Sequence, residues 1–148
     1  KPMVVLFPNF IQEVFEPYEL RTISILRNGK NQVVSKDYWL KNTETPEKKL
    51  LARTRFWAKC IDYYEDNWLG REGHLDLRYE TLCQQPEASL EACFAHLEVE
   101  SGLYKKEMPT LPQEKLKKWD ALDPNLKSEV LKFIEPAQKK LDDILPPK

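Results

Sequence analysis

An arginine and a serine follow a short apolar segment in the first quarter of the chain. Arg27 comes directly after the segment RTISIL, and Ser35 stands two helical turns further on. A guanidinium is a planar, permanently charged fork that suits a phosphate, and a serine hydroxyl adds a hydrogen-bond donor. Gly29 would let backbone amides at a helix N-terminus approach the same anion. The pattern predicts a phosphate site, and a solvated arginine beside a surface serine is the alternative interpretation.

Length and charge limit the classes of protein to which the chain can belong. Its 148 residues, 41% of them hydrophobic, are enough for one domain with a core, so we expect a single domain over 1–148. The 23 Lys and Arg nearly balance the 24 Asp and Glu, which excludes a general polyanion binder of the kind that coats nucleic acid. Any anion site must therefore be local.

Cysteine and histidine give no metal pattern. Cys60, Cys83 and Cys93 lack the spacing of zinc ligands, and His74 and His96 have no partner set, so we expect no metal. We interpret the cysteines as reduced core residues, which fits a reducing compartment. The two histidines are interpreted as a loop residue and a helix residue. No apolar run is long enough to cross a bilayer, and we expect a soluble chain.

The N-terminal half alternates strand and helix patterns. We expect a strand over residues 3–7, a helix that begins at Asn9 and ends before Pro17, a strand over 21–26, and a helix carrying residues 33–39. Ile23, Ile25 and Leu26 leave no polar face on the second strand. That strand is therefore expected to be buried on both faces, as in a parallel sheet.

The C-terminal half continues the alternation. We expect a helix over about 50–68, a strand in HLDLRYETL that runs into another helix, a helix with Pro86 in its first turn, and a last helix that begins near Asp123 and Pro124. The core-facing stripes of the three long helices are predicted to be Phe56, Trp57, Ile61, Tyr64 and Trp68, then Leu90, Cys93, Phe94 and Leu97, then Leu126, Val130, Ile134 and Leu141. Residues 98–113, with one glycine and two prolines, are expected to form an excursion or lid.

This alternation predicts an α/β fold with a parallel sheet flanked by helices. In such folds ligands bind beyond the carboxyl ends of the strands. Arg27 stands at such an end, so fold and chemistry point to the same place. Arg53, Arg55 and Trp57 on the next helix are interpreted as part of an amphipathic helix rather than as a site.

The segment ILRNGKNQVVSKDYW resembles the 3′-phosphate-binding segment of sulfotransferases that use 3′-phosphoadenosine 5′-phosphosulfate. In that family a strand is followed by an arginine, a loop and a Val-x-Ser. The resemblance implies that Arg27 and Ser35 hold the 3′-phosphate of the cofactor. It also implies the family's P-loop-like sulfotransferase fold and transfer of a sulfuryl group to a hydroxyl or amine acceptor.

Two later segments resemble the same family in the same order. LDLRYETLCQQPEASL is similar to the family's later strand and helix, whose tyrosine lies beside the adenine, so Tyr79 is the expected adenine contact. A core tyrosine at a strand end is the alternative. KLKKWDAL is similar to the basic segment before the C-terminal helix, and implies that Lys117 or Lys118 approaches the phosphate. A solvated, lysine-rich helix start is the alternative there.

The resemblance is to the C-terminal part of the family. No Gly-rich loop for the 5′-phosphosulfate occurs, and near Pro8, where many relatives have a lysine, the chain has Leu6 and Phe7. The catalytic residues are therefore unassigned. We expect this chain to be the C-terminal piece of a longer sulfotransferase domain that works with its N-terminal half.

The alternative functions are a non-catalytic module that binds a nucleotide or a protein through the same fold, and a nucleotide kinase, which the ordered motifs disfavour. The chain shows no signal-peptide pattern, so a cytoplasmic location is expected. The secretory pathway is the alternative if an anchor precedes the chain.

Overall fold

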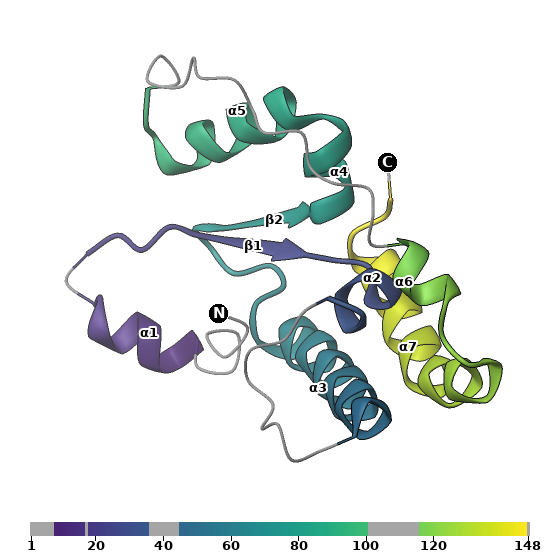
Figure 1. Cartoon of the computed structure of the whole chain (residues 1–148). Coiled ribbons are helices and arrows are strands. Elements are labelled where there is room, and N and C mark those ends of the chain that lie inside the picture. The colour runs from purple at the N-terminus through teal and green to yellow at the C-terminus, as the bar shows by residue number, and fades with distance from the viewer. Residues whose placement is uncertain (1–7, 17, 36–44, 101–115, 148) are drawn as a thin grey trace.

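The computed structural model describes residues 8–16, 18–35, 45–100 and 116–147. Its elements, in chain order, are α1 (Pro8–Val14), β1 (Thr22–Leu26), α2 (Gly29–Val33), α3 (Pro46–Asn67), β2 (His74–Arg78), α4 (Tyr79–Gln84), α5 (Pro86–Leu97), α6 (Leu116–Asp120) and α7 (Pro124–Ile144) (Figure 1). The described part is mostly helical around a small sheet. The strand expected over residues 3–7 and the lid expected over 98–113 fall wholly or largely outside the described residues.

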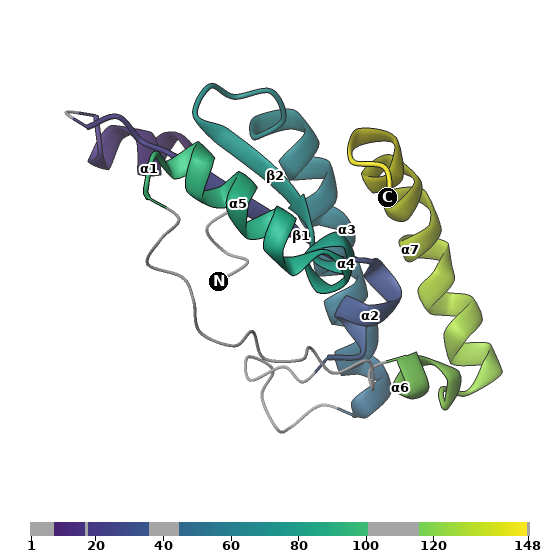
Figure 2. The same cartoon turned by 90° about the horizontal axis from the view of Figure 1, so that it is seen from above.

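The two described strands pair in parallel, as expected for an α/β arrangement. Thr22 lies opposite His74 and Leu26 lies opposite Arg78, so both strands end at the same edge of the sheet. The chain between them contains α3, which lies on one side of the sheet while α4 and α5 lie on the other (Figures 1 and 2). The residues after each strand, Arg27 and Tyr79, therefore emerge side by side.

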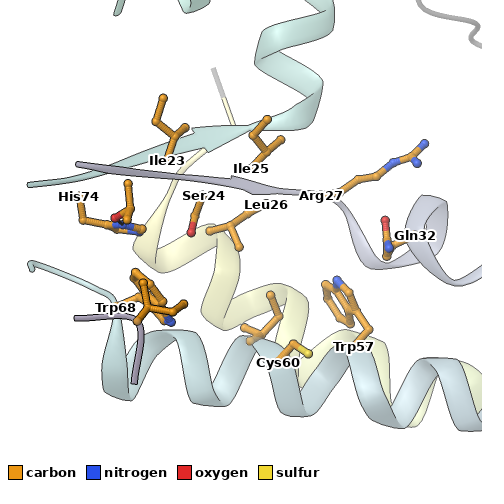
Figure 3. A pocket seen from close by; sticks show the side chains of 13 residues that line it. Ile23, Ser24, Ile25, Leu26, Arg27, Gln32, Trp57, Cys60, Trp68 and His74 are labelled. Carbon is orange, nitrogen blue, oxygen red and sulfur yellow. Dashed lines mark hydrogen bonds between the residues drawn. The ribbon is translucent and has the colours of Figure 1, made fainter. Parts of the chain in front are cut away.

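Burial of β1 on both faces was a wrong expectation. The side chain of Ile25 is 53% exposed. Figure 3 shows Ile23 and Ile25 pointing away from α3, whereas Ser24 and Leu26 point toward it. On the Ile25 side the covering helix α5 packs on β2, which leaves the outer face of β1 open within the described part of the chain.

The core lies between α3 and α7, which pack along each other (Figure 2). Its buried residues come from α2, α3, α6 and α7, and are Val33, Leu50, Trp57, Ile61, Trp119, Val130, Ile134, Ala137 and Leu141. The stripe predicted for α7 is confirmed, since Val130, Ile134 and Leu141 are buried and Leu126 packs against them. The stripe predicted for α3 is confirmed except for Phe56, which is 38% exposed.

Helix boundaries follow capping residues more closely than hydrophobic pattern. α3 begins at Pro46, because the Thr45 side chain accepts from the amide of Lys48 and the proline occupies the first turn. The hydrophobic pattern predicts this helix only from about residue 50, so the predicted start is wrong by about one turn. At α7 the expected cap is confirmed, since the Asp123 carboxylate accepts from the amides of Asn125 and Leu126.

The expectations for α5, α2 and the three cysteines have different outcomes. α5 begins at Pro86 as predicted, but its last stripe residue, Leu97, is 38% exposed. α2 ends at Val33, so the expectation of a helix is wrong at residues 34 and 35, while Tyr38 and Trp39 lie outside the described residues. Cys60, Cys83 and Cys93 are free thiols and half-buried. Of the helices described, none is both long and apolar enough to span a membrane.

Candidate functional site

The ends of β1 and β2 bring two of the predicted site residues together. Because Leu26 lies opposite Arg78, the next residues of the two strands are neighbours. The guanidinium carbon of Arg27 lies 4.4 Å from the centroid of the Tyr79 ring, the geometry of a cation–π contact. Burial, followed by the neighbouring Cys83 thiol, raises the pKa of Tyr79 above its ordinary value, so the phenol is neutral at physiological pH.

Several buried polar atoms near this edge have no hydrogen-bond partner. They are Arg27 Nε, Asn31 Oδ1, Arg53 Nε and Glu80 Oε2. Most buried polar side-chain atoms in folded proteins are paired, so a group of unpaired ones needs an explanation. Three of these residues lie in the segments that come after the strands, since Arg27 follows β1, Asn31 is in α2 and Glu80 is in the first turn of α4. This distribution is typical of a site that takes a polar ligand.

The turn between β1 and α2 is held by protein acceptors. The amide of Asn28 donates to Glu80 Oε1 (3.1 Å), that of Gly29 to Gln138 Oε1 (2.9 Å) and that of Lys30 to Asn28 Oδ1 (3.0 Å). The expectation that the Gly29 amide faces an anion is therefore wrong, because that donor is used by α7. Arg27 itself remains the positive group of the turn.

Gly29 has a packing role instead. A Cβ at this position would lie 2.7 Å from two ring carbons of Trp57 and 3.0 Å from a methyl of Ile134. No side chain fits there without displacing the core. The absence of a Cβ brings the turn against α3 and α7, and this close approach places the Gly29 amide within reach of Gln138.

Ser35 lies at the other end of α2, half-buried. Its hydroxyl donates to the Gln32 carbonyl (2.7 Å), and its own carbonyl accepts from Arg53 Nη1 (2.6 Å). Arg53 was interpreted from sequence as part of an ordinary helix face. The structure instead places this second arginine beside Ser35, and nothing in its spacing on α3 could have shown this.

The basic segment before the last helix is one element further away. Lys118 is exposed on α6, and the side chain of Lys117 lies outside what the structure describes. α6 packs against α2, where Lys30 Nζ lies 5.7 Å from the centroid of the buried Trp119 ring. Lys30 and Lys118 are thus described lysines of these two helices.

A cavity of about 600 Å³ opens below β1 on the α3 side. In Figure 3 Arg27 and Gln32 lie at one end of it and His74 at the other, with Trp57, Cys60 and Trp68 along its floor. Burial raises the pKa of the Cys60 thiol to about 11, so this sulfur is an unreactive thiol at neutral pH. The cavity is therefore apolar along its floor and polar at both ends.

Two supporting residues were missed from the sequence. Glu80 stands in the Tyr-Glu pair of the segment that resembles the sulfotransferases, and that pairing was a usable signal. Gln138 lies on α7, far along the chain from Gly29, and no local pattern marks it. In the part of the chain that the structure describes, no three His, Cys, Asp or Glu side chains come together as metal ligands.

Comparison with models of known protein families, with characterised proteins and with solved structures finds no match to this chain. The likeness to sulfotransferase segments therefore stays an expectation from the sequence. The geometry at the strand ends is the independent observation on which a function can be proposed.

Proposed function

We propose that this chain is the part of a sulfotransferase that binds the nucleotide end of 3′-phosphoadenosine 5′-phosphosulfate. In that reaction a hydroxyl or amine acceptor attacks the sulfur, and the bond from the sulfur to the 5′-phosphate oxygen breaks. The product nucleotide keeps its 3′-phosphate. The role of this chain in the proposal is to hold that phosphate and the adenine.

The observation that carries the proposal is the Arg27–Tyr79 pair. It lies beyond the carboxyl ends of two parallel strands, where α/β folds bind ligands, and the guanidinium stacks on the ring at 4.4 Å. The buried Nε of Arg27 has no hydrogen-bond partner. An arginine held in this way presents a charged fork at a fixed position, which suits a phosphate dianion.

Tyr79 then serves two purposes in the proposal. One face of its ring is covered by Arg27, and the adenine stacks on the remaining surface. Ser35 and Lys118 complete the phosphate site, with the Ser35 hydroxyl turning from the Gln32 carbonyl toward the phosphate. Arg53, which already donates to the Ser35 carbonyl, would hold that serine in place.

The sulfuryl-transfer step is assigned to no residue of this chain. The loop for the 5′-phosphosulfate and the catalytic base are proposed to come from an N-terminal half of the same domain. Binding without turnover is therefore the expected behaviour of the chain alone. A cytoplasmic location is part of the same proposal.

Calorimetric titration tests the proposal directly. The chain is titrated with 3′-phosphoadenosine 5′-phosphate and, separately, with adenosine 5′-phosphate. We expect binding of the first nucleotide and at least tenfold weaker binding of the second, because only the first carries the phosphate that Arg27 recognises. Arg27→Ala should abolish this preference. The matched control is Arg55→Ala, which removes an exposed arginine of α3 whose guanidinium lies over the Phe133 ring.

A negative result is also informative. If circular dichroism shows a folded chain and neither nucleotide binds, the sulfotransferase proposal fails for this chain. The alternative, a non-catalytic module that uses the same fold to bind a protein, then takes its place. If both nucleotides bind equally and Arg27→Ala changes nothing, the chain binds adenosine nucleotides without a 3′-phosphate site.

A further inference from the structure

A second polar cluster lies at the opposite edge of the sheet from Arg27. Thr22 and His74 are the first residues of β1 and β2 and lie opposite each other in the parallel register. Asp76 follows His74 by two positions, so both side chains are on the same face of β2. Figure 3 shows His74 below the strand and above Trp68. The cluster takes no part in the nucleotide site proposed above.

The hydrogen bonds of the cluster give the imidazole a defined tautomer. His74 Nε2 lies 3.0 Å from Asp76 Oδ1, and a carboxylate only accepts, so Nε2 carries the proton. In the neutral ring Nδ1 is then an acceptor, and the Thr22 hydroxyl, at 2.6 Å, donates to it. Carboxylate, imidazole and hydroxyl thus form one chain. This is the order of groups that activates a hydroxyl as a nucleophile.

The surrounding side chains fix this arrangement. The Tyr64 hydroxyl donates to Asp76 Oδ1, and the Trp68 ring packs on the imidazole with centroids 4.9 Å apart. His96 Nε2 donates to the Thr22 carbonyl at 3.1 Å. The His74 side chain is 2% exposed, so the ring is held on every side by β1, β2, α3 and the loop before β2.

Burial shifts the pKa values of both His74 and Asp76, and two charged neighbours add to the shift of His74. Burial lowers the pKa of His74, and His96 and Arg71 lower it further. Burial raises the pKa of Asp76 to about 6. Above about pH 6 the carboxylate is ionised, and the lowered pKa of His74 favours the neutral imidazole, as in a resting hydroxyl-activating triad.

A cavity adjoins the cluster. Thr22 and His74 line a cavity of about 740 Å³, together with Tyr18, Trp68, Arg71 and His96. A bonded network that served only to hold two strands together would need no such space. The cavity wall combines aromatic surface with charges of both signs, since Glu16 and Glu72 line it as well.

We propose that Thr22 is an activated nucleophile that takes the acyl group of a small carboxylic ester bound in this cavity. Thr22 Oγ1 attacks the ester carbonyl while its proton passes to His74 Nδ1. The carbon–oxygen bond to the alcohol then breaks, and the alcohol leaves with that proton. The product is an ester of Thr22, which water hydrolyses by the same route. Asp76 is a positioning residue that keeps the proton on Nε2.

The experiment uses p-nitrophenyl acetate as the probe and the intact chain near pH 7.5. We expect one acetyl group per chain by intact mass, mapped to Thr22 by peptide sequencing. Thr22→Val should give none, Thr22→Ser should be acetylated, and His74→Gln should slow the reaction by roughly 100-fold or more. Thr81→Val, which removes a threonine of α4 outside the cluster, is the matched control.

The pH profile separates a reactive network from a structural one. The acetylation rate should rise as the pH increases through about 6 and then level off, and this dependence should be lost in His74→Gln. Acetylation of folded wild type at the rate of Thr22→Val, or at other residues only, would overturn the proposal. If the variants unfold, the peptide map of the wild-type chain still shows whether Thr22 is the residue that is acetylated. Nucleotide binding is measured separately, so the two proposals stand or fall independently.

Discussion

The guanidinium of Arg27 lies over the ring of Tyr79, 4.4 Å from its centroid, at the ends of two parallel strands. The two residues come from separate segments, each of which was predicted from sequence to form part of a nucleotide site. The register of the sheet alone makes them neighbours, because each follows one residue of the Leu26–Arg78 pair. A property of the whole sheet therefore sets the distance between them.

The first prediction concerns the Tyr79 ring. Tyr79→Phe keeps the aromatic face under Arg27 and should change the affinity for 3′-phosphoadenosine 5′-phosphate by less than threefold. Tyr79→Leu removes the cation–π contact and should weaken binding by roughly 2- to 30-fold, the equivalent of about 0.5–2 kcal/mol. Calorimetry measures both variants. Equal losses in the two would show that the hydroxyl, rather than the ring face, matters.

A second prediction tests the close approach at Gly29. Gly29→Ala places a methyl 2.7 Å from the Trp57 ring and should lower the free energy of unfolding by about 1–3 kcal/mol, measured by urea denaturation. In a Trp57→Phe background, the loss of unfolding free energy caused by Gly29→Ala should be smaller, because the smaller ring leaves room for the methyl group. Gly70→Ala is the control, since Gly70 has a φ of +72° and open space around it. Its cost comes from backbone strain, and Trp57→Phe should not reduce it.

Arg78 gives a third prediction, because its guanidinium is buried against the end of α7. Nε donates to the Leu145 carbonyl (2.6 Å) and Nη2 to the Leu141 carbonyl (3.0 Å), while Nη2 also pairs with Asp142. Arg78→Lys loses the fork and should cost about 1–3 kcal/mol in unfolding free energy. Asp142→Asn should cost less than about 1 kcal/mol, because that carboxylate is 40% exposed. A larger loss of unfolding free energy for Asp142→Asn than for Arg78→Lys would mean that the ion pair stabilises the fold more than the hydrogen bonds to the two carbonyls.

The fourth prediction is a pH dependence at Asp76. Burial raises its pKa from 3.8 to about 6, so the folded state favours the protonated carboxyl. The resulting stabilisation is complete below about pH 3.8 and is lost as the pH rises through about 6. The unfolding free energy of Asp76→Asn minus that of wild type should therefore increase between about pH 4 and pH 7. A constant difference would contradict the raised pKa.

Local patterns were sufficient for most elements of the fold. The stripe of α7 and the Asp123 cap depend on neighbouring residues, and both were predicted. The start of α3 was missed because Thr45 and Pro46 stand among charged residues, where hydrophobic period gives no signal. The exposure of Ile25 depends on which strand α5 covers, and that is a tertiary fact with no local pattern.

The candidate site also combines residues that the sequence could reveal with contacts that it could not. Arg27 and Tyr79 could be named from sequence because a parallel sheet brings its strand ends together. The hydrogen bond that occupies the Gly29 amide could not be predicted from sequence. Its acceptor, Gln138, is distant in the chain and faces the amide only after α7 has packed on α3. The pattern HLDLRYETL predicts a strand from His74, although the histidine itself was interpreted as a loop residue. His74 begins β2, and its pairing with Thr22 follows from the register.

The bond from Gly29 to Gln138 has a consequence for the order of events during synthesis. The ribosome makes the turn after β1 first, and the acceptor that fixes that turn is made 109 residues later. Trp57 and Ile134, which enclose Gly29, are likewise separated by most of the sequence. The Arg27 turn can therefore adopt its final shape only after α7 has left the exit tunnel, so a nascent chain truncated before Gln138 would be released without a formed site.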